Sequence, residues 1–204
     1  MNGQSTGRSR FGAMVVEAVG AAVLMVVVVA VMWGVEIMDY VLPENLDNYG
    51  IAGWQPSGLI GILFAPFLHV DFGHLLANTL PLLILGFVAA MRGIGRFLTA
   101  SLLIVLVGGL GTWLTTPVGV VAVGASGLIF GYFGYVVSRG IFDRSLVDIL
   151  IGIVVAAVYY SMLTGLLPTQ EGVSWQGHLF GLVGGVVAAW ILRRRARPAA
   201  ELAL

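Results

Sequence analysis

The chain has 204 residues, of which 59% are hydrophobic and only 10% are charged, and its formal net charge is zero. Soluble domains of this size carry about 25% charged residues, so the composition excludes an ordinary soluble domain and predicts a polytopic membrane protein. Because the chain has no cysteine, no Cys/His cluster and no GxxxxGK[ST] loop, disulfides are excluded, and a structural zinc site, a nucleotide or a nucleic-acid partner has no support.

The N-terminal part of the chain predicts one membrane helix followed by a long outer connection. Residues 1–12 are polar and are expected to be a short disordered cytoplasmic tail, and the apolar run Ala13–Val35 is expected to be the first span. This run exceeds the 7–15 residues of a signal-peptide core, so we interpret it as a retained helix. Within the connection Glu36–Asp71, the apolar stretch Gly58–Leu68 is too short to span and is interrupted by Pro66, so it is expected to lie at the membrane interface.

Five further apolar runs complete the expected set of spans: Leu75–Met91, Phe97–Leu114, a helix within Val118–Ser138, Leu146–Leu167 and Ser174–Leu192. We therefore predict an all-α membrane domain of six transmembrane helices over residues 13–192, followed by a basic tail, 193–204. All 10 basic residues fall in the two tails and in the loops after the second and fourth spans. The positive-inside rule then predicts a multi-pass protein of the plasma membrane with both termini in the cytoplasm.

Four polar residues lie within the apolar segments, each near the outer end of its span: His74, Asn78, Ser126 and His178. At about 1.5 Å per helical residue they lie roughly 20 to 27 Å from the inner arginines, in a hydrocarbon core about 30 Å thick. A helix beginning at Ser126 is too short to cross alone, so Val118–Ala125 would be non-helical chain, which a membrane tolerates only if it is buried in protein or lines a water-filled cavity. We predict that the four residues meet at one depth, below a cavity that brings water to Ser126.

These four side chains carry the functional groups of a hydrolytic site, although each alone has a simpler explanation. A serine or asparagine in a membrane helix is more often a packing contact or an interhelical hydrogen bond, and the shared depth is what favours chemistry. His178 can act as the base for Ser126, and the Ser126 N–H with the side chains of Asn78 and His74 can stabilise an oxyanion. Asp71, three residues before His74, is the one carboxylate that could share this depth, and we expect it to be structural. We therefore expect a Ser–His dyad rather than a triad.

Glycines recur at intervals of four in two of the expected spans. Gly127 and Gly131 are four residues apart, and Gly177, Gly181 and Gly185 repeat that spacing, which is typical of close helix–helix packing in membranes. We predict that this packing brings the sixth span, and with it the histidine, close to the fourth.

The chain carries His69-x4-His74-x3-Asn78, Gly124-x-Ser126-Gly127 and His178-x2-Gly181-x3-Gly185, and these three motifs resemble those of the rhomboid family of intramembrane serine proteases. The resemblance covers about residues 13–192. It implies that Ser126 is the nucleophile, that His178 is the general base and acid, and that His74, Asn78 and the Ser126 N–H form the oxyanion site. It also implies a six-helix core, a half-embedded first loop, a gate at the fifth span and the loop after it, no cofactor, and single-span membrane proteins as substrates that are cut near the outer face.

Two positions depart from the family's pattern. Trp54 is followed by Gln55, where members often have a Trp-Arg pair that anchors the first loop. Phe130 stands where many members have a tyrosine against the catalytic histidine, and it can stack but cannot donate a hydrogen bond. Neither change removes a reacting group, so we expect an active protease. The alternatives are a catalytically inactive rhomboid-like protein that binds membrane substrates, and a small transporter with His74 and His178 as a proton relay; the oligomeric state is left open.

Overall fold

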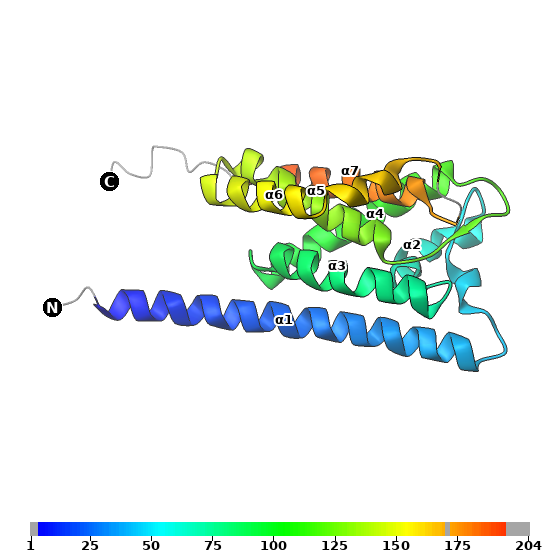
Figure 1. Ribbon diagram of the computed structural model, residues 1–204, viewed down its shortest axis with the longest axis horizontal. Helices are drawn as coiled ribbons and strands as arrows, with labels where there is room; N and C mark the ends of the chain where they lie inside the picture. The colour runs from blue at the N-terminus through cyan, green and yellow to red at the C-terminus, as the bar shows by residue number, and fades with distance from the viewer. Residues whose placement is uncertain (1–3, 170–171, 195–204) are drawn as a thin grey trace.

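The computed structural model describes residues 4–169 and 172–194, and its helices run side by side along the long axis of the molecule (Figure 1). The longer helices, in chain order, are α1 (Gln4–Val41), α3 (Phe72–Ala90), α4 (Ile94–Thr115), α5 (Ser126–Asp143), α6 (Leu146–Val158) and α7 (Trp175–Ile191). The short elements are the helix α2 (Gly61–Phe64), the 3₁₀ helices η1 (Leu46–Tyr49), η2 (Pro56–Leu59), η3 (Ala65–Phe67) and η4 (Tyr160–Leu166), and the strands β1 (Ile51–Ala52) and β2 (Val121–Ala122).

Membrane-spanning capacity is clearest in three helices of the described chain. The segment Gly12–Val41 of α1, together with α3 and α4, is long and apolar enough to cross a bilayer, and α6 with η4 makes a fourth candidate if the bent pair counts as one span. The helix α7 is apolar but has only 17 residues. The protein is thus mostly helical, with three or four candidate spans by length and composition.

The first helix is longer at both ends than its apolar run predicted. It begins at Gln4, so the prediction of a disordered tail is wrong for residues 4–12, and it continues to Val41, six residues into the expected outer connection. Both extensions lack proline, and lengthening a helix that already exists costs far less than nucleating one. A tertiary contact also stabilises the outer extension, because Tyr40 packs against Phe72 at the start of α3. Of the predicted tail 193–204, residues 195–204 lie outside the described chain.

The predicted fifth span, Leu146–Leu167, is broken. The helix α6 ends at Val158 after 13 residues, and η4 continues at an angle of 68° to it. Tyr159, between them, leaves the helical conformation (φ −105°, ψ 14°). The bend turns η4 toward α7, against which it packs.

The predicted fourth span begins as a helix at Ser126, as expected, and the preceding segment 118–125 is non-helical. The connection between α1 and α3, residues 42–71, is called the first loop below. Within segment 118–125, β2 pairs antiparallel with β1 of this first loop, with Ile51 opposite Ala122 and Ala52 opposite Val121. The all-α prediction is wrong in this one detail. Buried non-helical backbone needs partners for its polar groups, and this short β-ladder supplies some of them.

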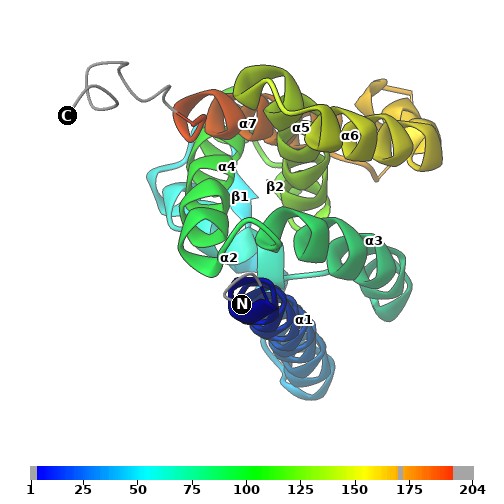
Figure 2. The same cartoon turned by 90° about the vertical axis from the view of Figure 1, so that its left-hand side faces the viewer.

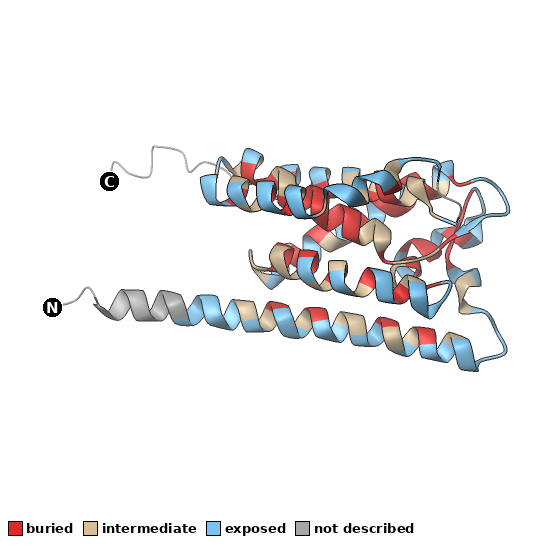
Figure 3. Cartoon of the chain, in the orientation of Figure 1, coloured by how far each residue is buried: buried red, intermediate tan, exposed pale blue. Residues whose placement is uncertain are grey.

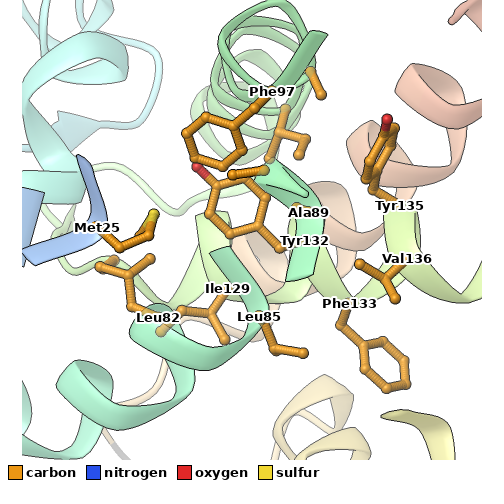
Figure 4. Packing of buried hydrophobic residues seen from close by; sticks show 14 of the residues in the cluster. Met25, Leu82, Leu85, Ala89, Phe97, Ile129, Tyr132, Phe133, Tyr135 and Val136 are labelled. Carbon is orange, nitrogen blue, oxygen red and sulfur yellow. The ribbon is translucent and has the colours of Figure 1, made fainter. Parts of the chain in front are cut away.

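The core is built around α5, which packs against α3, α4, α6 and α7, whereas α1 lies at the edge of the bundle beside α3 (Figure 2). Burial follows this arrangement, because α1 is mostly exposed while the facing sides of the other helices are buried (Figure 3). Tyr132 of α5 lies at the centre, with its ring 5.2 Å from that of Phe97 and its hydroxyl 2.8 Å from that of Ser101 (Figure 4). This packing holds the start of α5 in a fixed position.

Two tryptophans join the first loop to the outer end of α4. The indole Nε1 of Trp113 donates to the carbonyl of Gln55 (2.9 Å), and the backbone N–H of Trp54 donates to the carbonyl of Trp113 (3.3 Å). The two indole rings lie 5.8 Å apart. The first loop therefore has an anchor that does not require an arginine after Trp54.

Candidate active site

Ser126 and His178 meet although 52 residues separate them in the chain. Ser126 is the first residue of α5, His178 lies in the first turn of α7, and the serine Oγ is 2.8 Å from the histidine Nε2. The ring of Phe130, one turn after Ser126, stacks on the imidazole with centroids 4.2 Å apart and an angle of 12°. The imidazole is thus held by a hydrogen bond at one edge and an aromatic ring on one face.

The close approach of α7 to α5 depends on the predicted glycines. A Cβ atom at Gly181 would overlap the carbonyl oxygen of Gly127, and one at Gly185 would overlap that of Gly131. These backbones touch without side chains between them, which is the arrangement that small residues permit in membrane helices. Ser126 and His178 lie beside this contact, so the glycines set the distance between them.

The turn that leads into Ser126 requires glycine at position 124. Gly124 has φ +114°, which L side chains rarely adopt. A Cβ there would also lie 2.6 Å from Cε1 and 2.8 Å from Nε2 of His74. The Gly124 N–H donates to the carbonyl of Ala65 in η3 (2.9 Å). The first loop and His74 therefore both hold the turn that presents Ser126.

His69 also contacts this turn; the sequence placed it in the motif His69-x4-His74-x3-Asn78 but gave it no role in the site. Its Nε2 accepts from the N–H of Ala125 at 3.4 Å, and its ring lies edge-on to His74 with centroids 5.1 Å apart. Burial, with a smaller contribution from His74, lowers the pKa of His69 to about 4, so the ring is neutral near pH 7 and its nitrogen can accept. The spacing His69-x4-His74 was the signal for this contact.

His74 and Asn78 share one face of α3, as their spacing predicts. Asp71 caps the helix by accepting from the His74 N–H at 2.7 Å. Asn78 is only 5% exposed and its Nδ2 donates to the His74 carbonyl at 3.0 Å. A side-chain amide has two N–H groups, so Asn78 retains one donor beyond this bond. The structure brings the edge of the His74 ring against Gly124, two residues from Ser126.

A cavity lies beside Ser126, between the first loop, α4 and the start of α5. Its empty volume is about 480 Å³, open space at its mouth included. Small or apolar residues predominate in its lining, among them Ala65, Gly108, Gly109, Thr112, Gly124 and Gly177. A cavity thus adjoins the serine, with room for a small apolar group and for water, and its opening toward the outer face stays a prediction.

The arrangement combines the parts that acyl transfer needs. A hydroxyl in contact with a neutral imidazole nitrogen is the usual form of an activated serine. Ser126 is the first residue of α5, and N–H groups at the start of a helix have no partner within the helix. The second ring nitrogen of His178, Nδ1, lies 2.9 Å from the backbone carbonyl oxygen of Gly165. The site thus has a hydroxyl, an imidazole nitrogen that can accept its proton, and a nearby N–H donor.

Comparison with known proteins adds a family relationship. Residues 56–195 match the Rhomboid domain. Uncharacterized proteins of Mycobacterium tuberculosis and Mycobacterium bovis are each 43% identical over 182 residues, which cover 85% of this chain and 76% of theirs. An uncharacterized protein of Mycobacterium leprae is 40% identical over 171 residues, which cover 80% of this chain and 68% of that protein.

Proposed function

The chain belongs to the rhomboid family of polytopic membrane proteins, and from this we propose that it is an intramembrane serine endopeptidase that cleaves single-span membrane proteins near the outer membrane face. The observation that carries the proposal is the 2.8 Å contact between Ser126 Oγ and His178 Nε2. Ser126 is the first residue of α5 and has no helical carbonyl four residues before it, whereas the mid-helix Ser138 donates to the carbonyl of Gly134. Pairing with an imidazole is the arrangement that makes serine a nucleophile.

The chemistry follows from the positions of these groups. His178 Nε2 takes the proton as Ser126 Oγ attacks the scissile carbonyl carbon, and it then gives that proton to the leaving amine. The negative charge on the carbonyl oxygen is stabilised by the Ser126 N–H and by donors from Asn78 and His74. Water entering from the cavity then hydrolyses the acyl-enzyme, with His178 acting as base once more. No cofactor takes part in this scheme.

The topology proposed with this function has six spans and both termini in the cytoplasm. In addition to the candidate spans, α5 and α7 each cross as shorter helices, and the non-helical segment before Ser126 completes the fourth crossing. The support is the distribution of the arginines, all of which lie in the tails, in or beside the α3–α4 loop, or in and beside the C-terminal end of α5. This orientation directs the cavity beside Ser126 toward the outer face of the plasma membrane.

The direct test is to incubate the purified protein with a fluorophosphonate probe and, separately, with a single-span reporter substrate in lipid vesicles. We expect covalent labelling at Ser126 and two cleavage fragments that arise from a cut near the outer end of the reporter's span. A protein that binds the reporter but neither labels nor cuts would be an inactive relative instead. Proton flux coupled to a solute, without cleavage, would identify a transporter.

Asn78→Ala is expected to lower kcat by about 10²–10³-fold, because one oxyanion donor is typically worth that much. The KM for the reporter should change little, since the donor acts mainly when charge develops on the carbonyl oxygen. The measurement is steady-state cleavage of the reporter, with Asn48→Ala, in the exposed part of the first loop, as the matched control. Full activity in the Asn78 variant would remove this residue from the oxyanion site.

Gly181→Ala is expected to lower kcat by at least about 10²-fold, because the added methyl overlaps the Gly127 carbonyl and must push α7 away from α5. A displacement of about 1 Å of a catalytic group costs roughly that factor. Gly34→Ala is the control, since a Cβ at Gly34 meets nothing within 4 Å. If both variants cleave the reporter equally well, the glycine contact does not set the distance between serine and histidine.

A further inference from the structure

The segment that follows the bend in the fifth span touches the histidine of the site through its backbone. The carbonyl oxygen of Gly165, in η4, lies 2.9 Å from Nδ1 of His178. This is the opposite ring nitrogen from the one that contacts Ser126 at 2.8 Å. Each nitrogen of the imidazole therefore has one partner, and the two partners come from different helices.

The chemical nature of the Gly165 group decides which nitrogen carries the proton. A carbonyl oxygen can accept a hydrogen bond but cannot donate one, so the short contact requires a proton on Nδ1. In a neutral imidazole the other nitrogen is then unprotonated, and the Nε2 lone pair is free to accept from the hydroxyl of Ser126. The contact with Gly165 thus selects the tautomer in which His178 can act as a base.

Glycine at position 165 is also what lets the backbone come this close. A Cβ there would lie 2.9 Å from Nδ1 and 3.3 Å from Cε1 of His178, and 3.3 Å from Cζ of Phe130. Phe130 stacks on one face of the imidazole, so the ring cannot retreat in that direction. Any side chain at position 165 would displace either the imidazole or η4.

We propose that the backbone carbonyl of Gly165 is the positioning group of His178, in the place that a carboxylate occupies in a Ser–His–Asp triad. This inference rests on the proposed serine-protease function. The Nδ1 proton stays on Nδ1 throughout, and the carbonyl stabilises the positive ring that forms when Nε2 takes the serine proton. Because the carbonyl belongs to η4, a movement of η4 away from α7 removes the partner of Nδ1 and disconnects the base.

The test makes the Gly165 carbonyl a weaker hydrogen-bond acceptor without adding an atom. Replacing Leu166 by its α-hydroxy acid converts the Gly165–Leu166 amide into an ester, whose carbonyl is a poorer acceptor. The same replacement at Leu163, in the same 3₁₀ helix, is the matched control, since it leaves the Gly165 carbonyl untouched. We expect kcat to fall about 10–100-fold for the ester at 166, the range for a hydrogen bond to a charged group, with KM unchanged. Equal rates in the two esters would overturn the proposal.

A second readout does not depend on activity. The chain has three histidines, so nitrogen NMR of the histidine-labelled protein, with His178 assigned by comparison with His178→Gln, reports which of its ring nitrogens carries the proton. We expect Nδ1–H in the unmodified protein and an increased share of Nε2–H in the ester at 166 but not at 163. An Nε2–H tautomer in the unmodified protein would overturn the role of Gly165 even if the protein cleaves its reporter. An Nδ1–H tautomer that the ester at 166 shifts, in a protein that neither labels nor cleaves, would support the positioning role and reject the protease function.

Discussion

Ser126→Ala is expected to abolish cleavage of a single-span reporter, with a fall in kcat of about 10⁶-fold, and to abolish fluorophosphonate labelling. Loss of either the serine or the histidine costs a serine protease about this factor, because the two act as one unit. His178→Ala should therefore be about as inactive, and the double variant should be no worse than either single one. The measurement is fragment release in vesicles over a time long enough to detect residual turnover.

A loss of cleavage is informative only if these variants keep the fold of the parent protein. Ser138→Ala is the matched control, since this serine lies in the same helix and donates to the Gly134 carbonyl of its own backbone. It should retain full activity, and all variants should unfold at nearly the same temperature as the parent protein. Cleavage by Ser126→Ala at the parent rate would reject the protease function outright.

Asp148→Ala is expected to destabilise the protein by about 3–5 kcal/mol, a large part of the 5–15 kcal/mol that typically separates folded from unfolded states. Asp148 is 1% exposed, and it pairs with Arg92 from the loop after α3 and with Arg139 of α5. Arg139 is itself only 4% exposed and donates to the carbonyl of Val88 at 3.1 Å. Removing the carboxylate leaves a buried guanidinium without its counter-charge.

Thermal unfolding in detergent measures this effect, and a second ion pair at the same end of the bundle provides the control. Asp143 pairs at 4.0 Å with Arg194, whose side chain is 58% exposed. The Asp143 side chain is itself only 6% exposed and also accepts from the Arg194 backbone N–H at 2.7 Å, but its charged partner is solvated. Asp143→Ala therefore leaves no buried cation unpaired and should lower the unfolding temperature less than Asp148→Ala does. Equal effects from the two substitutions would show that burial of the Asp148 pair contributes little.

The sequence predicted the elements better than it predicted their interruptions. The spans at α3 and α4 and the helical start at Ser126 were placed to within a few residues, because long apolar runs bounded by charges leave few alternatives. No proline or charged residue in the sequence marks the break after Val158. The bend is stabilised by what η4 contacts on α7, which is a property of the packed protein.

Arg139 shows a similar limit of prediction from the sequence. Its position after an apolar run indicated the cytoplasmic end of a span, and in the structure it lies near the C-terminal end of α5. Arg139 is not exposed to solvent at that end, however, since it is buried against Asp148. Charge type and spacing predicted the side of the membrane, whereas burial depended on a carboxylate from the next helix.

What the sequence by itself determined is the membrane class, the order of the apolar segments and which few polar residues lie within them. These follow from hydrophobicity and helical rise, which are properties of single segments. The tertiary structure decided how Ser126 and His178 meet, that His69 supports the turn before the serine, and that the Gly165 carbonyl contacts the far side of the imidazole. Each of these is a contact between segments, and a backbone carbonyl is the same in every residue, so no pattern of side chains could have predicted which one would lie beside His178.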